Sequence, residues 1–441
     1  MSQAGNNQVV ISGVGVISAL GNGIEPLWEA MLEGRTGLKR IERFDPSGFD
    51  SQVAGVLDEE AFNVRKIVPK SHRKATKVMC RDTELAVGAA AAAVENAGIN
   101  TAGTSDEPPT IDPNRVGCHI GAGLISAEVN ELGAALVTSK KDDGSFDLDH
   151  WGREGMQNLS PLWLLKYLPN MLACHVTIVH DCRGPSNTIT CCEASSGLSI
   201  AESRRVIQRG DADACLSGGA EDRVNPLALY RQHCTGRLAK TDGSGDMTTV
   251  VRPFSDNASG TIIGEGGGIL LIEHASSCNE RGGLPWCTID GIGCRQSCTD
   301  SPLEADPRAI ESAINKAMSD AGCNPSDINL IVPFGSGIPS IDAAELEGLT
   351  LIFGEALQDI PTIITIPYTG NCMAGNGAIC VGVAAKAIKE QMVPARIGTE
   401  KTNGINAFKC NATKASINRV LVVTPSEGGQ CVAIILGRID P

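Results

Sequence analysis

The order of apolar and polar residues along the chain predicts strands that alternate with helices. Residues 8–21, QVVISGVGVISALG, form an apolar, β-branched run that ends in glycine, which predicts a buried strand and a turn. Residues 24–34 have helical spacing and stop at a glycine, and residues 81–99 predict a long Ala-rich helix. Residues 114–125 predict a second buried strand. Alternation of this kind indicates an α/β fold built in layers.

The second half of the chain repeats this order. The apolar run at 283–294 resembles the first strand, and the helix predicted at 306–323 resembles the Ala-rich helix. A further buried strand is predicted at 327–338. Residues 369–391 then resemble residues 191–210, because each is a run of small residues that leads into an apolar helix. We therefore expect an internal duplication with a period of about half the chain.

We expect this duplication to divide the chain into an N-terminal half, residues 1–275, and a C-terminal half, residues 276–441. No linker rich in proline, serine or charge separates the two halves. The irregular stretch around residues 142–161 interrupts the first half, and we expect it to be an inserted cap or an interface segment.

Composition narrows the classes of function. The net charge of -14 argues against a nucleic-acid-binding protein, because that affinity comes mostly from Lys and Arg neutralising phosphates. No apolar run reaches membrane-spanning length and no signal peptide is recognisable, so we expect a cytoplasmic protein. The 17 cysteines are odd in number and lack zinc-ligand spacing, so we expect free thiols, no metal and no other cofactor.

Several segments resemble one known family. The segment Arg183–Asp222 contains G-P-S, then CCEASSG, then GDADACLSGGAED. It resembles the nucleophile region of β-ketoacyl synthases, the condensing enzymes of fatty-acid and polyketide synthesis. VVISGVGVISALGNG, LPNMLACHVTI and RPFSDNASGTIIGEGGGILLIE resemble other parts of the family, so the resemblance covers the whole chain. It implies a duplicated thiolase-like fold with five layers, α-β-α-β-α, mixed sheets and a dimer.

The resemblance also indicates which residues occupy the family's reactive positions. In the family, a Cys at a helix N-terminus carries the acyl chain as a thioester, and two His residues stabilise the charge that develops on the malonyl thioester. Six residues separate Ser186 from Glu193 and sixteen separate Glu193 from Gly210, as around the family's Cys. The motif spacing therefore assigns Glu193 to the Cys position, and Phe334 and Asn371 to the two His positions.

Ile366 and Glu427 also depart from the family pattern, whereas Asp342 and Glu345 agree with it. Asp342 and Glu345 follow Phe334 by eight and eleven residues, which is the family spacing for the first His. A Lys near the second His is replaced by Ile366, and the Phe that gates the acyl tunnel is replaced by Glu427. The resemblance therefore implies a retained scaffold in which the reacting groups are replaced.

Glu193 has three interpretations. It is either a carboxylate that polarises the old pocket at a helix N-terminus without reacting, a general base for different chemistry, or a nucleophile. We rank the first interpretation highest and the third lowest. Cys192 and Cys372 adjoin replaced positions, and we expect both to be small buried thiols rather than substitutes for the missing groups.

We expect a catalytically degenerate β-ketoacyl synthase that resembles a chain-length factor and pairs with an active ketosynthase. One alternative is a homodimeric acyl-thioester enzyme, either acting as a 3-oxoacyl synthase-like acyltransferase or using Glu193 for other chemistry. Another is a protein that binds acyl chains without reacting. The resemblance is far more specific for the family than for the activity.

A basic segment offers a partner site. Residues 65–77, RKIVPKSHRKATK, contain six Lys or Arg residues and no acid. They are either a solvated helix face or a docking patch for acyl carrier protein, which is strongly acidic, and we weigh the two readings equally. The docking residues would be Lys66, Lys70, Arg73 and Lys74.

Overall fold

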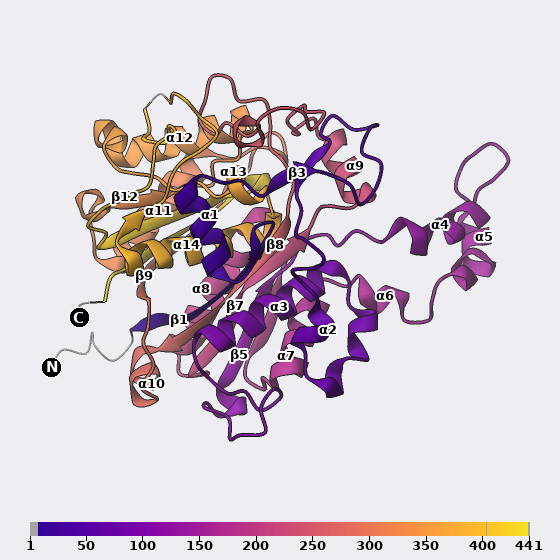
Figure 1. Cartoon of the computed structure of the whole chain (residues 1–441), viewed down its shortest axis with the longest axis horizontal. Helices are drawn as coiled ribbons and strands as arrows, with labels where there is room; N and C mark the ends of the chain where they lie inside the picture. Colours follow the sequence, from indigo (N-terminus) through magenta and orange to yellow (C-terminus); the bar gives the residue numbers. More distant parts are fainter. Residues whose placement is uncertain (1–7, 403, 440–441) are drawn as a thin grey trace.

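The computed structural model describes residues 8–402 and 404–439, and its centre is one long mixed sheet (Figure 1). The sheet consists of two successive sets of strands, in the orders β1-β8-β7-β5-β6 and β9-β14-β13-β10. The first set comprises β1 (Val9–Ser18), β5 (Val116–Gly121), β6 (Ser186–Ile189), β7 (Ala214–Asp222) and β8 (Glu265–His274). The second comprises β9 (Cys287–Gln296), β10 (Leu330–Val332), β13 (Arg419–Pro425) and β14 (Gln430–Gly437).

Both sets follow the same directional pattern. In the first set, β5 is parallel to β6 and β7, while β8 is antiparallel to β7 and β1. In the second, β10 is parallel to β13, while β14 is antiparallel to β13 and β9. A parallel bridge from Ile331 to Thr362 stands where β6 stands in the first set. The sets join where Val10 and Ile11 pair with Thr288 and Cys287, and their identical order confirms the duplication expected from the sequence.

Helices form three layers around the two sets of strands. The outer layer on the first set is α3 (Arg81–Asn96) and α7 (Met171–His180). The outer layer on the second set is α11 (Pro307–Ala321) and α12 (Pro339–Phe353). Between them, α8 (Ser195–Gln208) and α14 (Asn376–Glu390) contact strands of both sets. This arrangement is the expected α-β-α-β-α sandwich, and α14 is apolar on nearly all sides because protein surrounds it.

The sequence signals at helix ends match the structure. The side chain of Asp306 accepts a hydrogen bond from the backbone of Arg308, 2.8 Å away, at the start of α11. Gly322 ends the same helix in the left-handed conformation. The remaining helices and strands are α1 (Ile24–Glu33), α2 (Val64–Ile67), α4 (Val129–Thr138), α5 (Leu148–Arg153), α6 (Trp163–Lys166), α9 (Pro226–Cys234), α10 (Ala275–Glu280), α13 (Ile366–Thr369), β2 (Gly21–Asn22), β3 (Leu38–Arg40), β4 (Val53–Gly55), β11 (Met392–Val393) and β12 (Thr413–Lys414).

Glycines on β1 and β9, the two strands that join the halves of the sheet, allow unusually close helix packing. A Cβ atom on Gly15 of β1 would overlap the carbonyl oxygen of Ala89 on α3. A Cβ atom on Gly293 of β9 would overlap the carbonyl oxygen of Ala313 on α11 in the same way. The two halves therefore repeat both their strand order and the contact that sets the distance between sheet and helix.

An arm projects from the layered body and carries α4 and α5 (Figure 1). The stretch 142–161 was expected to be irregular, but it contains α5 and a 3-10 turn, Gly155–Asn158. Large apolar side chains are exposed along the arm, with Val137 and Leu148 each 74% exposed. The expectation that this stretch is an inserted cap or an interface segment stays a prediction, which these exposed apolar side chains motivate.

The thiols agree with the expectation from the sequence, since all 17 cysteines are free. Within residues 8–402 and 404–439, no helix combines the length and the apolar content needed to cross a membrane.

Replacing Gly15 with Ala tests the helix–strand contact. We expect Gly15→Ala to lower the free energy of unfolding by about 1–3 kcal/mol, because α3 must move away from β1. Gly48→Ala is the matched control, since a Cβ there would meet no atom within 4 Å, and it should change stability by less than about 0.5 kcal/mol. Chemical denaturation measures both values, and equal stability of the two variants would contradict the packing argument.

Candidate functional site

Two short turns meet in the middle of the sandwich. The 3-10 turn Cys192–Ala194 leads into α8, and the 3-10 turn Met373–Gly375 leads into α14. The turns contact each other, and each begins with a non-glycine residue of positive φ, 47° at Cys192 and 44° at Met373. Strained backbone of this kind is found preferentially at functional sites, so the point where the two helix entries meet is the candidate site.

Glu193 lies in the first of these turns and is only 1% exposed. Its Oε2 accepts a hydrogen bond from the hydroxyl of Ser426 at 3.2 Å and from the backbone N–H of Glu427 at 3.3 Å. The carboxylate thus binds the loop that follows β13, at the entry of α8 where free N–H groups favour negative charge. Sequence analysis identified Glu193 and Glu427 separately, and the structure brings them together.

Arg237 completes this cluster and was not identified from the sequence. Its guanidinium forms an ion pair with the carboxylate of Glu427, and both side chains are largely buried. Burial lowers the pKa of Arg237, whereas the neighbouring Glu193 counteracts this effect. The cluster therefore has a cation between two carboxylates, and a single Arg in a loop carries no pattern by which a sequence could predict this role.

A second buried acid, Glu221, binds the entry of α14 from the end of β7. It is at the end of β7, and its Oε2 accepts a hydrogen bond from the backbone N–H of Ala374 at 2.9 Å. Its other oxygen is 2.5 Å from the Arg223 guanidinium. Burial raises the pKa of Glu221, Arg223 opposes the rise, and the nearby carboxylate of Glu193 adds to it. Glu193 and Glu221 thus influence each other within one buried site.

The thiol beside Glu193 is a weak nucleophile. Cys192 is partly buried, and burial raises its pKa to about 11. The carboxylates of Glu193 and Glu221 contribute to this rise after burial, because they disfavour a further negative charge. A thiolate is therefore scarce at neutral pH, which is the opposite of the arrangement around a reactive cysteine.

The remaining predicted positions are buried. Phe334 and Ile366 pack in one apolar cluster, and the backbone N–H of Phe334 donates to Glu345 at 2.8 Å. Asn371 adjoins the second turn, where its Oδ1 accepts the backbone N–H of Met373 at 2.8 Å. Cys372 is also fully buried, and burial raises its pKa above the usual range. Phe334 and Ile366 thus offer apolar surface, and Asn371 supports the turn.

The basic segment lies on the surface at α2 and the two 3-10 turns that follow it. Lys66, Lys70 and Lys74 are exposed and Arg73 is partly buried. None of the four has a carboxylate oxygen within 4.0 Å among the residues that the structure describes. Their charge is therefore available to a partner.

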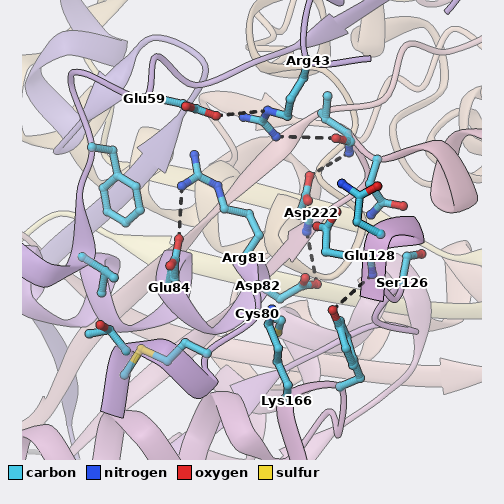
Figure 2. Close-up of a pocket in the computed structure, with 18 of the residues that line it drawn as sticks. Arg43, Glu59, Cys80, Arg81, Asp82, Glu84, Ser126, Glu128, Lys166 and Asp222 are labelled. Atoms are coloured by element: carbon cyan, nitrogen blue, oxygen red, sulfur yellow. Dashed lines mark hydrogen bonds and ion pairs between the residues drawn. The ribbon is translucent and has the colours of Figure 1, made fainter. Parts of the chain in front are cut away.

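A separate cleft of about 800 Å³ lies between the start of α3 and the base of the arm (Figure 2). Asp82 and Asp222 line it, and the backbone N–H of Asp222 donates to Asp82 Oδ1 at 3.2 Å. Burial raises the pKa of Asp82 well above its usual range and that of Asp222 to about 7. Neither acid was identified from the sequence. Asp82 lies in the first turn of α3 and Asp222 is the last residue of β7, and charged residues are common at such positions.

Two family models match most of the chain. The β-ketoacyl synthase N-terminal domain matches residues 6–277, and the β-ketoacyl synthase C-terminal domain matches residues 286–400. Among known proteins, 3-oxoacyl-[acyl-carrier-protein] synthase 2 of Staphylococcus aureus (strain COL) is 31% identical over 396 residues, which are 89% of this chain and 88% of the relative.

Solved structures share the fold. The ishigamide ketosynthase/chain length factor has a TM-score of 0.82 at 24% identity and covers 99% of this chain and 100% of its own. AntDE:AntF, a type II PKS acyl-carrier protein in complex with its ketosynthase bound to the hexaketide, has a TM-score of 0.81 at 20% identity, with coverage of 99% and 100%. At these identities the two structures establish the thiolase-like architecture.

The raised pKa of Cys192 predicts slow alkylation. At pH 8 we expect iodoacetamide to modify Cys192 at least about 30-fold more slowly than the exposed Cys298, because so little thiolate is present. The rate should rise about tenfold per pH unit up to pH about 11, and Glu193→Gln should increase it at pH 8. Peptide mass spectrometry measures both sites in one sample. Equal rates at Cys192 and Cys298 would contradict this account of the site.

Proposed function

This chain belongs to the β-ketoacyl synthase family, and from that membership we propose that it is a non-condensing subunit, similar to a chain-length factor, that acts with an active ketosynthase. The coarser assignment, to fatty-acid or polyketide synthesis, follows from the family. The specific role rests on the residues at the reactive positions.

One observation carries the proposal, namely that all the reacting groups are replaced together while the scaffold is retained. By motif spacing, Glu193 stands for the acyl-carrying Cys, and Phe334 and Asn371 stand for the two His residues. A phenylalanine side chain has no hydrogen-bond donor, and an asparagine cannot become a cation. An enzyme loses its reaction when catalytic groups that act as a unit are replaced together. The residues at these three positions therefore give no chemical basis for decarboxylative condensation.

The contacts of Glu193 support a silent site. Its carboxylate cannot carry a thioester, and it already binds Ser426 and the backbone of Glu427. Arg237 holds the side chain of Glu427 from the other side. This buried ion cluster occupies the helix entry where an acyl chain would begin, which agrees with a subunit that shapes a shared tunnel from outside the reaction.

The arm and the edge strand β6 (Ser186–Ile189) support pairing with a second chain. β6 is the last strand at one edge of the sheet and is followed closely by the turn that contains Glu193. Its first two residues, Ser186 and Asn187, are exposed. An unpaired strand edge and exposed apolar side chains on the arm are the features that an interface covers. We propose a dimer through this face, in which the second chain is an active ketosynthase.

A second candidate function is an acyl-thioester enzyme that uses Glu193 as a general base. The observation that favours it is the proximity of Glu193 to Glu221, whose pKa is raised by burial and by this neighbour. Pairs of carboxylates in unlike environments are typical of acid–base catalysis. In that case the chain would act as a homodimer on its own thioester substrate.

Assays of the purified chain with acyl and malonyl carrier-protein thioesters separate these functions. We expect the chain alone to condense them at least about 10³-fold more slowly than an active ketosynthase. Adding the chain to the ketosynthase of its host should change the length of the product. Mass spectrometry of the products measures both effects.

Controls distinguish the outcomes of this experiment. Condensation by the chain alone that is lost in Glu193→Ala would overturn the proposal. Thioester hydrolysis that is lost in Glu193→Gln, but retained in the control Glu202→Gln on the surface of α8, would establish the second candidate instead. Native mass spectrometry of protein from its own host distinguishes a heterodimer from a homodimer, whose mass is twice 46.0 kDa.

The basic segment gives a prediction about carrier-protein docking, which we propose to involve Lys66, Lys70, Arg73 and Lys74. Reversing two of these charges with Lys70→Glu and Arg73→Glu should weaken binding of the host's acyl carrier protein about tenfold or more at low salt. Lys316→Glu, at an exposed site on α11, is the matched control. Titration calorimetry measures the affinities, and equal affinities for both variants would leave the segment as a solvated surface.

A further inference from the structure

We propose that the cleft of Figure 2 binds a small organic zwitterion, with a primary ammonium group at Asp82 and Asp222 and an anionic group at Arg65 and Lys77. The cleft is lined by residues 43–44, residues 59–65, residues 76–77, the start of α3, the base of the arm, and the end of β7 with the residues that follow it. The cleft shares no residue with the cluster around Glu193, although Arg65 and Lys77 belong to the basic segment 65–77.

The floor of the cleft contains two carboxyl groups without a cation of their own. Asp82 is 3% exposed and Asp222 is 4% exposed, yet both line the cleft. Two arginines are close, but they bind a third acid, since Arg43 and Arg81 each lie 2.6 Å from a carboxylate oxygen of Glu265. In the described part of the chain, no ion pair within 4.0 Å involves Asp82 or Asp222.

The surroundings of this pair disfavour two negative charges. Burial is the main reason that the pKa of both groups is raised, and each is raised further by a neighbouring carboxylate. Among the charged groups on the packed elements, Glu221 raises the pKa of Asp82 and Glu265 raises that of Asp222, while Arg43 and Arg81 lower the pKa of Asp222 without cancelling its rise. An ammonium ion placed between the two acids would supply the missing countercharge, so both acids would ionise and release protons as it binds.

The donor set favours an organic cation over a metal ion. Across residues 8–402 and 404–439, no group of three or more His, Cys, Asp or Glu side chains is arranged to hold a metal. The cleft also has apolar and aromatic walls, which include Phe62, Met79 and Tyr167. Such walls suit the hydrocarbon part of an amine and offer a hydrated metal ion nothing.

The rim of the cleft has the opposite charge to its floor. Arg65 and Lys77 line the cleft and are exposed, and neither has a carboxylate oxygen within 4.0 Å among the described residues. In contrast, Lys166 is already paired with Glu131 at 2.5 Å. Acids at the floor and free cations at the rim complement a molecule with an ammonium group at one end and an anion at the other.

The test uses unbranched ω-amino acids as probes, namely β-alanine, 4-aminobutyrate and 6-aminohexanoate, with hexylamine and hexanoate as single-charge controls. Titration calorimetry on the full chain should detect binding of at least one amino acid, about tenfold or more tighter than either control. Repeating the titration in buffers of different ionisation enthalpy should reveal proton release on binding. Asp82→Asn should reduce this proton release, because only Asp222 can then ionise, and should weaken binding about tenfold or more.

Variants at the rim provide the second arm. Arg65→Ala with Lys77→Ala should weaken binding of the amino acid about tenfold while leaving that of hexylamine unchanged, and Lys316→Ala should change neither. The thermal midpoint of each variant verifies that it is folded, and we expect Asp82→Asn not to lower it, because the uncharged amide keeps an oxygen that can accept the hydrogen bond from Asp222. The proposal is overturned if no amino acid binds below about 10 mM, if hexylamine binds as well as the amino acids, or if Asp82→Asn binds like the unaltered chain.

Discussion

Two hydrogen bonds hold the entry of α14 against the first half of the molecule, one to the end of β7 and one to the first turn of α8. The backbone N–H of Ala374 donates to buried Glu221 at 2.9 Å, and that of Ala378 donates to Ser196 at 3.0 Å. Because one helix follows strands of the first set and the other follows strands of the second, these bonds join the two halves at their centre. Burying an acid costs free energy unless its oxygens are bound, and here the bonds to it also fix the site.

This junction determines the surroundings of Glu193, which motif spacing assigns to the family's Cys position. Glu193 is one residue after the strained backbone of Cys192, so it enters α8 with its carboxylate in the buried site. The same turn leaves the Cys192 thiol among carboxylates, where its pKa rises to about 11. The two neighbours therefore differ, since the Glu193 carboxyl is hydrogen-bonded to the loop after β13, whereas burial and nearby carboxylates suppress the Cys192 thiolate.

The two clusters of charge differ in how completely they are neutralised. Around Glu193, Arg237 and Glu427 form an ion pair, and the loop backbone satisfies the remaining carboxylate. In the cleft, the Asp82 carboxyl accepts the backbone N–H of Asp222 and the Asp222 carboxyl accepts that of Val224, while Arg43 and Arg81 bind Glu265. The first arrangement is closed on itself and the second has an unmet need for positive charge, which is why the ligand is sought in the cleft.

The sequence by itself determined the strands, the helices, the duplication and the family, because apolar periodicity, end caps and motif spacing are local properties of the chain. It also identified Glu193 and Glu427 as unusual, each from its place in a motif. Only the tertiary structure decided that these two residues meet, that Arg237 pairs with one of them, and that Asp82 lies beside Asp222. Such contacts join residues far apart in the chain, and a single charged residue has no periodicity that reveals its partner before the chain folds.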